Sequence, residues 1–223
     1  MADIFPFRAY RYDSQRVQPG DVLTQPYDKI TPAMQQRYAR SSPYNLIAVE
    51  KGESRPSDSP SDNVYTRAER ALKQWIAEGI LVRDSIPGIY VYSQEYPVPG
   101  SAERRIRSGF IALGRVEDYS AGIVFRHEYT LTGPKADRME LLRHARTHTG
   151  QLFMLYTDPK RRVDVLLATA ASGAAPVQAR DTPPQNAIIT TALPAAIIAR
   201  MNTATLRSRS CAKSSDTLGT IIR

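Results

Sequence analysis

Two polar stretches of the chain combine residue types that could act on a bound anion. The longer one, residues 127–138 (HEYTLTGPKADR), gathers His127, Glu128, Thr130, Lys135, Asp137 and Arg138. This set includes a candidate general base, a carboxylate able to bind a metal ion, and two cations that could neutralise phosphate charge. The GPKADR segment is not a Walker loop, because the second glycine and the Lys-Ser/Thr pair are missing. A solvated helix start held by salt bridges would show the same composition, so both interpretations stay open.

The second stretch, residues 19–32 (PGDVLTQPYDKITP), places Tyr27 and Asp28 just before a helix start. Thr31-Pro32 has the residue types of an N-cap and a first helical position. Backbone N–H groups at such a point can bind an anion, or a nearby carboxylate can cap them. Asp28 is therefore either a cap or a site residue.

The sequence predicts no metal site. His144 and His148 lie four residues apart, a spacing that allows two imidazoles to share a metal ion. However, no glutamate follows His144 in the zinc-protease pattern, and Arg143 and Arg146 flank the pair, which favours an exposed basic helix face. Cys211 is the single cysteine, so an internal disulfide and a thiolate zinc cluster are both excluded.

The elements that must position these residues follow from apolar spacing and turn signals. Helices are expected over 62–78 with Gly79 as its cap, over a short segment from Thr31-Pro32 to before Pro43, and from Pro134 to near Gly150. Apolar runs predict strands at 45–50, 80–82, 89–92, 107–116, 151–156 and 163–168, with strand and loop over 1–30 and a loop over 52–62. Short strands alternating with two main helices predict an α+β (mixed α/β) domain over residues 1–170.

Residues 171–223 differ in composition from the rest. All 18 aromatic residues lie at or before Tyr156. The segment 182–223 has five basic residues and one acid, and thus supplies +4 of the formal net charge of +8. We expect an irregular, poorly ordered tail here, arising from truncation or from an altered reading frame.

Location and partners are constrained only loosely. No apolar run approaches a membrane span, and the N-terminus lacks the features of a signal peptide, so a cytoplasmic protein without a membrane partner is expected. The basic charge is compatible with a nucleic-acid partner. The helix over 62–78 followed by the strands up to residue 92 resembles a winged-helix layout, in which Arg67, Arg70 and Lys73 would contact DNA. A non-enzymatic nucleic-acid-binding regulator is therefore the alternative hypothesis.

Several blocks of the sequence coincide with a known family. They are FPFRAYRYD at 5–13, QPYDKITP at 25–32, SPYNLIAVEKGE at 42–53, GIYVYSQEY at 88–96, GFIALGRVEDY at 109–119 and HEYTLTGPKADRMELLRHARTHTGQLFMLYTD at 127–158. Over about residues 4–168 the chain resembles the domain of unknown function 1015 family. Members are usually longer and carry a GHHRYE-like block, similar to the phosphate box of ParB-type and sulfiredoxin-like domains, which this sequence lacks.

The resemblance implies a function as well as a set of residues. Family members have been labelled helix-turn-helix regulators, and some are linked to ATP-dependent phosphorylation of free serine. The matched polar residues are Tyr27, Asp28, Asn45, His127, Glu128, Thr130, Lys135, Asp137 and Arg138. Lys135 and Arg138 would bind phosphate oxygens, and Asp28 or Glu128 would take a hydroxyl proton or Mg²⁺. The leading hypothesis is the N-terminal part of a nucleotide-dependent kinase for a small, serine-like metabolite, with ATP and Mg²⁺ as cofactors and little or no turnover as it stands.

Overall fold

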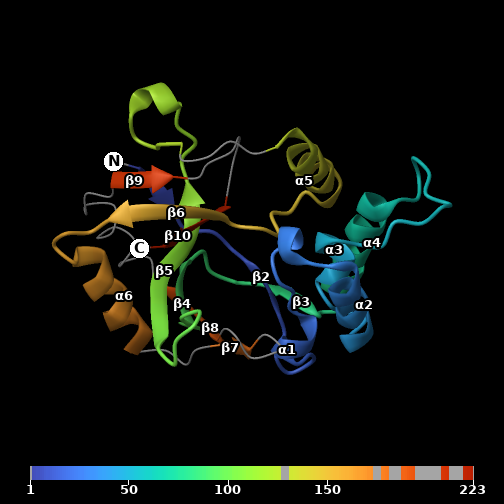
Figure 1. The fold of residues 1–223 in the computed structure, drawn as a ribbon, viewed down its shortest axis with the longest axis horizontal. Coiled ribbons are helices and arrows are strands. Elements are labelled where there is room, and N and C mark those ends of the chain that lie inside the picture. The colour runs from blue at the N-terminus through green and yellow to red at the C-terminus, as the bar shows by residue number, and fades with distance from the viewer. Residues whose placement is uncertain are drawn as a thin grey trace. The chain divides into compact units, whose positions relative to one another are not determined.

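The computed structural model describes residues 2–126 and 131–172, and the backbone of four further strands at 177–180, 187–193, 207–210 and 218–222 (Figure 1). Helices and mostly antiparallel strands confirm the predicted α+β class. The chain forms two compact units. Unit 1 consists of Met1–Ala9, Ser85–Tyr129 and Gln151–Arg223, and unit 2 of Tyr10–Asp84 and Thr130–Gly150. The predicted domain boundary at residue 170 stays a prediction.

Unit 1 is built on an eight-stranded sheet. Its strands are β1 (Ile4–Phe5), β4 (Ile89–Pro97), β5 (Arg104–Gly114), β6 (Leu152–Thr157), β7 (Val177–Arg180), β8 (Ala187–Leu193), β9 (Arg207–Ser210) and β10 (Leu218–Ile222). The order is β7-β8-β4-β5-β10-β6-β9, and β1 pairs with β5. Strand β10 is antiparallel to β5 and parallel to β6, so it joins the two parts of the sheet.

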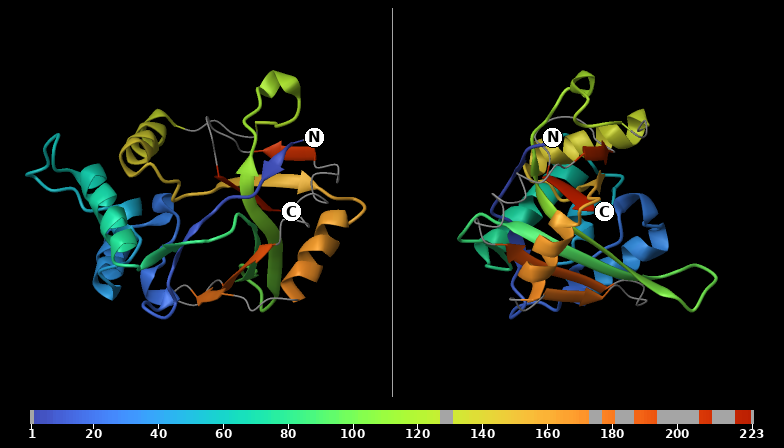
Figure 2. Two further views of the ribbon diagram at one scale, coloured as in Figure 1. Left: turned by 180° about the vertical axis from the view of Figure 1, so that it is seen from behind. Right: turned by 90° about the vertical axis from the view of Figure 1, so that its left-hand side faces the viewer.

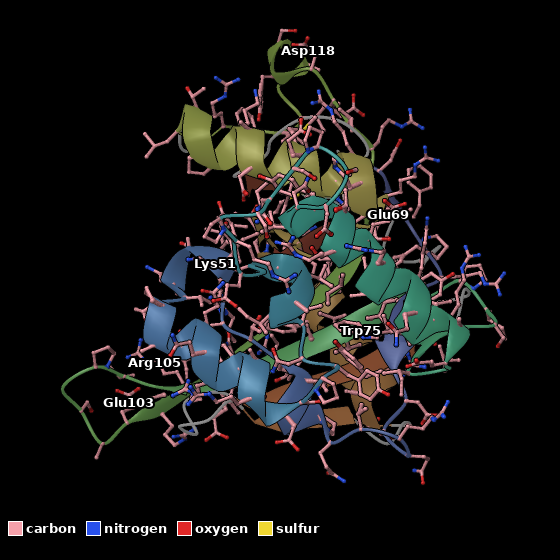
Figure 3. All side chains as sticks on the ribbon, turned by 90° about the vertical axis from the view of Figure 1, so that its right-hand side faces the viewer. Lys51, Glu69, Trp75, Glu103, Arg105 and Asp118 are labelled. Carbon is pink, nitrogen blue, oxygen red and sulfur yellow. The ribbon has the colours of Figure 1, made fainter. Side chains whose placement is uncertain are left out.

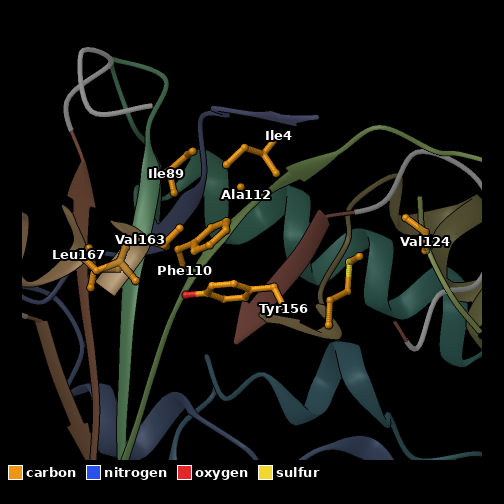
Figure 4. Close-up of a cluster of buried hydrophobic side chains, with 10 residues drawn as sticks. Ile4, Ile89, Phe110, Ala112, Val124, Tyr156, Val163 and Leu167 are labelled. Carbon is orange, nitrogen blue, oxygen red and sulfur yellow. The ribbon is translucent and has the colours of Figure 1, made fainter. Parts of the chain in front are cut away.

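The core of unit 1 lies between the sheet and helix α6 (Arg162–Ser172), which packs on β4 and β5 (Figure 2). Phe110 and Tyr156 come from two strands, and their ring centroids lie 5.8 Å apart. Val163 and Leu167 of α6 project into the same cluster (Figure 4). Their four-residue spacing puts both on one helix face, which is why this segment is buried on one side only.

The predicted strand over 163–168 is therefore wrong, since these residues belong to α6. The signal for the helix comes from Asp158, whose buried carboxylate accepts hydrogen bonds from the backbone N–H groups of Arg162, Val163 and Asp164 at 2.9, 2.7 and 3.2 Å. A carboxylate that satisfies the first N–H groups of a helix favours helix formation. The predicted strands over 107–116 and 151–156 are confirmed as β5 and β6.

Unit 2 is mainly helical. Its elements are β2 (Tyr10–Tyr12), α1 (Pro19–Val22), a 3-10 turn (Tyr27–Lys29), α2 (Pro32–Ser41), α3 (Ile47–Glu50), α4 (Val64–Ala77), β3 (Leu81–Arg83) and α5 (Thr132–Ala145). Its core surrounds Trp75, which lies on α4 (Figure 3) and is 3% exposed, together with Leu72, Val22 and Leu141. This core fixes α4 and α5 against each other.

Helix ends in unit 2 follow the predicted signals. The Thr31 hydroxyl accepts from the Met34 N–H, as expected for the N-cap of α2. Helix α4 begins at Val64, two residues after its predicted start, because Asn63 forms a reciprocal capping box with Thr66. Gly79 has φ +68°, a left-handed conformation that suits glycine and ends the helix.

Three other predictions in this unit are corrected. Residues 45–50 form a helical turn rather than a strand, because the Asn45 side chain accepts from the Ile47 N–H and starts α3. Pro19–Val22 is also a helical turn, since proline at the first position is compatible with helix. Helix α5 ends at Ala145 rather than near Gly150. The next residue, Arg146, has a left-handed backbone conformation with φ 49°, which ends the helix.

The hairpin that completed the winged-helix layout is absent from the described strands. Strand β3 pairs with β2, and β4 pairs with β5 in the other unit. The apolar runs at 80–82 and 89–92 are strands as predicted, but local sequence does not specify which partner each one takes. No helix in the described part of the chain combines the length and apolar character needed to cross a bilayer.

Candidate functional site

Arg138 of α5 is the centre of a polar cluster within unit 2. Its Nε and one terminal nitrogen donate to Asp137 Oδ2 at 2.8 and 2.5 Å. The guanidinium also donates to Glu50 Oε2 at 3.1 Å and to the Glu50 backbone carbonyl at 3.0 Å. Its carbon atom lies 4.2 Å from the centroid of the Tyr27 ring, a cation–π contact. Four of the five N–H donors of a guanidinium are thus engaged, and one remains for a ligand.

Tyr65 of α4 fixes the other side of the cluster. Its hydroxyl donates to Asp137 Oδ1 at 2.9 Å, so each oxygen of that carboxylate has a partner. Burial and this hydrogen bond raise the pKa of the Tyr65 hydroxyl, because both disfavour the phenolate. The Tyr65 ring also stacks on His144 with centroids 5.7 Å apart. Tyr65 therefore acts as a neutral donor that holds Asp137 in place.

Glu50 and Lys51, at the end of α3, are site residues that sequence reasoning did not select. Glu50 is 7% exposed, and its Oε1 has no hydrogen-bond partner among the described residues. Lys51, labelled in Figure 3, donates from Nζ to the carbonyl oxygens of Tyr27 and Ile30 at 3.2 and 2.7 Å. The sequence signal is the pair of charges, Glu50 and Lys51, directly at the end of the apolar run NLIAV, a run that the apolar pattern predicts as a strand.

The beginning of α5 has the features of an anion-binding helix end. Leu131 at the N-cap provides no side-chain hydrogen bond, and the first turn contains no acid. Lys135 is exposed and has no ion pair within the described chain. A Cβ added at Gly133 would meet no atom within 4 Å, so the backbone here is open. The uncapped N–H groups and the lysine together present positive charge.

The sequence-predicted residues separate into four groups. Tyr27, Asp137 and Arg138 are brought together in the cluster, and Lys135 lies one turn earlier on α5. Asp28 is exposed on the 3-10 turn, and its carboxylate has no hydrogen bond to any described residue. His127, Glu128 and Thr130 lie outside the described residues.

Asn45 forms the fourth group and is part of the scaffold. It is 1% exposed, and its amide nitrogen donates to the Asp21 carbonyl at 2.7 Å and to Ser41 Oγ at 3.1 Å. With its oxygen engaged by Ile47, both ends of the amide are occupied by the chain. The prediction that Asn45 binds phosphate is therefore replaced by a supporting role, in which it anchors α3 and hence Glu50.

The described residues contain no group of three or more His, Cys, Asp or Glu side chains arranged to hold a metal ion. Within the cluster, the charges of Glu50 and Asp137 are matched by those of Arg138 and Lys51. A balanced set of this kind has little attraction for an additional metal cation. Lys135, which has no ion pair among the described residues, lies one turn away near the start of α5.

The three cations of α4 that the winged-helix hypothesis assigned to DNA form ion pairs with carboxylates of unit 2. Arg67 pairs with Asp58 at 2.7 Å, Arg70 pairs with Asp62, and Lys73 pairs with Glu69 at 2.7 Å. These pairs neutralise the face that the winged-helix hypothesis assigned to DNA. The observation gives that hypothesis no support.

Comparison with known proteins gives one result. A family model described as "Protein of unknown function (DUF1015)" matches residues 4–192, which extends the resemblance beyond residue 168. No curated protein and no solved structure matches the chain significantly. Because the match covers most of the sequence, the chain belongs to the DUF1015 family.

Proposed function

We propose that this protein binds the phosphates of a nucleotide at the start of α5 and transfers a phosphoryl group to a small hydroxylated metabolite, at the low rate expected without the GHHRYE-like block. The observation that carries the proposal is the N-terminus of this 14-residue helix: the side chain of its N-cap, Leu131, makes no hydrogen bond, its first turn contains no acid, and Lys135 close by is exposed. The family resemblance adds ATP with Mg²⁺ as the donor and free serine as one acceptor.

The physical basis is the charge of the helix end. Unpaired N–H groups and aligned peptide dipoles are equivalent to about half a positive charge at a helix N-terminus. Phosphate oxygens are strong acceptors for such groups, and glycine allows them to approach the backbone closely. Gly133 supplies that access, and Lys135 adds a full charge. Arg138, three residues later on the same side of the helix, keeps one N–H donor without a hydrogen-bond partner among the described residues.

Phosphoryl transfer depends mainly on positioning and on neutralising the charge of the transferred group, which suits a site made of backbone N–H groups and cations. ATP would bring its own Mg²⁺, which usually keeps several waters and the substrate phosphates as ligands. An Mg²⁺ ion that arrives bound to ATP does not require a cluster of three protein carboxylates, and the described residues contain none. Asp28 and Glu128 stay proposed ligands for it.

Calorimetric titration of ATP with Mg²⁺ tests the proposal. Lys135→Ala should weaken binding about 10-fold or more, because a charge-assisted hydrogen bond to phosphate contributes roughly 1.5–3 kcal/mol. Gly133→Ala should weaken binding while preserving the helix, since the added methyl meets no protein atom and alanine is the better helix former. Arg143→Ala, which removes a cation near the other end of α5, is the matched control.

Two results would overturn the proposal. One is a wild-type protein that binds no nucleotide. The other is affinity that survives both Lys135→Ala and Gly133→Ala. Binding of duplex DNA that weakens steeply with salt, measured in parallel, would instead favour the regulator hypothesis.

A further inference from the structure

Glu50 has an unusual environment for a carboxylate. Its side chain is 8% exposed, and only Oε2 is paired, with Arg138 at 3.1 Å. Oε1 is buried and accepts no hydrogen bond from the described chain. A buried acceptor without a donor costs about 1–3 kcal/mol, and more when it is charged. Proteins typically keep such a destabilising unpaired oxygen where the group has a functional role, such as binding a ligand or transferring a proton.

The neighbouring donors already have partners. Lys51 Nζ is held by two backbone carbonyls, and the Tyr65 hydroxyl is held by Asp137. Arg138 directs most of its N–H groups to Asp137 Oδ2 and to the Glu50 carbonyl and Oε2. No described donor is in place for Oε1, and a hydroxyl group of a bound molecule is the simplest donor for a carboxylate oxygen.

The position of Glu50 relative to the proposed phosphate site at the start of α5 indicates which molecule would supply this donor. Lys135 and Arg138 lie three residues apart on one face of α5, so their side chains emerge roughly 4.5 Å apart along the helix axis. Arg138 in turn contacts Glu50. A phosphate at the start of α5, the guanidinium and the carboxylate thus follow one another in space. A phosphoryl-transfer site needs this order: donor phosphate, a cation at the transferred group, and an acceptor-side base.

We propose that Glu50 binds the hydroxyl group of the phosphoryl acceptor and takes its proton, a role that the family resemblance assigns to Asp28 or Glu128; the inference rests on the proposed function. The hydroxyl proton moves to the Glu50 carboxylate as the hydroxyl oxygen bonds to the γ-phosphorus of ATP. The bond from this phosphorus to the bridging oxygen breaks, and ADP leaves with the bond's electron pair.

Arg138 controls access to this carboxylate. Its contacts with Asp137 are 2.5 and 2.8 Å long, whereas those with Glu50 are 3.0 and 3.1 Å. A phosphate that binds the guanidinium competes with Glu50, to which Arg138 gives one side-chain hydrogen bond, and with Asp137, to which it gives two. Asp137 and the Tyr27 ring keep the guanidinium near α5 while the Glu50 carboxylate becomes available. Phosphate binding would thus precede exposure of the base.

Transfer of the γ-phosphoryl group from labelled ATP with Mg²⁺ to free L-serine, to glycerol and to water tests the assignment. Glu50→Gln should lower the transfer rate by about 10²–10⁴-fold, the usual contribution of a general base. Its affinity for ATP should change less than about 3-fold, since Glu50 is placed on the acceptor side. Glu53→Gln, which alters an exposed carboxylate close in the chain, is the matched control and should keep the wild-type rate.

Glu50→Asp keeps the negative charge opposite Arg138, and it therefore distinguishes loss of the base from loss of the fold. It should unfold at nearly the wild-type temperature yet lose at least about 10-fold in rate, because the shortened side chain withdraws the carboxylate. A wild-type rate in folded Glu50→Gln overturns the assignment of Glu50. ATP binding without transfer to any of the three acceptors also overturns it and leaves the nucleotide site standing. A wild-type protein that binds no ATP overturns the proposed function and this inference together.

Discussion

Replacement of Arg138 by methionine should destabilise unit 2 strongly. Methionine retains the apolar stem but removes the charge that compensates Glu50, whose side chain is only 8% exposed. Loss of one partner from a buried ion pair costs about 3–5 kcal/mol. The Arg138 side chain is itself 28% exposed, so solvent screening reduces this to about 2–3 kcal/mol. Loss of the cation–π contact with Tyr27 adds about 0.5–1 kcal/mol, giving roughly 3 kcal/mol in total.

Urea unfolding followed by tryptophan fluorescence measures this effect in the relevant unit. Trp75 is the only tryptophan in the sequence, and it is buried in the core of unit 2. Arg143→Met is the control, because Arg143 pairs with Glu140 on the exposed surface of the same helix. It should cost less than about 1 kcal/mol.

A double variant separates the pair from the individual residues. In Glu50→Met/Arg138→Met both charges are gone, and replacing a buried pair by apolar side chains is often nearly neutral. The double variant should therefore be more stable than Arg138→Met alone, with a coupling free energy of about 1–3 kcal/mol. If Arg138→Met unfolds at the same urea concentration as Arg143→Met, Glu50 is not the buried partner described above, and the reasoning is refuted.

Two further predictions concern other carboxylates. Asp158→Ala removes the acceptor of three backbone N–H groups at the start of α6, so it should destabilise that helix by about 2 kcal/mol; faster amide hydrogen exchange at Val163 would show this, and unchanged exchange would contradict it. The hydrogen bond from Arg67 holds the pKa of Asp58 below its ordinary value. The stability that Asp58 contributes is therefore complete above an ordinary carboxyl pKa of about 3.9 and is lost as pH falls through the depressed folded value. The stability difference between wild type and Asp58→Asn should shrink with acidification below about pH 4, and a constant difference from pH 6 to 2.5 would count against this account.

The secondary structure was predictable wherever the signal was local. Helix α4 has apolar residues at helical spacing, a capping box and a glycine at its end, and all three are visible in the sequence. The two segments wrongly predicted as strands, 45–50 and 163–168, are short apolar runs in which helix and strand have similar patterns. In each case a polar side chain a few residues earlier, Asn45 or Asp158, captures backbone N–H groups and selects helix.

Strand pairing was less predictable because it depends on residues far apart in the sequence. Adjacent strands often pair, which made a hairpin of 80–82 and 89–92 reasonable. In the structure Leu81 is instead opposite Tyr12, and Tyr90 is opposite Ile111. Strand β3 belongs to unit 2 and strand β4 to unit 1. The local amino-acid composition of the two segments does not indicate this division.

The site shows the same contrast between local and distant information. The GPKADR segment lies on α5, as its helix-start signal predicts, and the ring of Tyr27, another residue that the family resemblance selects, lies against Arg138 of this helix. Glu50 was missed because it ends a run that looks like a strand, where an isolated acid is normally exposed. Its burial becomes evident only when Arg138, 88 residues later, covers it.

The chemistry of Arg138 explains why a guanidinium rather than an ammonium suits this position. Donors on one planar group reach Asp137 on one side and Glu50 on the other, while its face lies on the Tyr27 ring. A lysine ammonium is a point charge with three donors, so it could approach one carboxylate closely or share itself between both at longer distance. With a guanidinium, the Glu50 contacts can break while the Asp137 contacts persist. The same side chain can therefore neutralise a buried acid in the free protein and turn to a phosphate in the complex, which links anion binding to the exposure of Glu50.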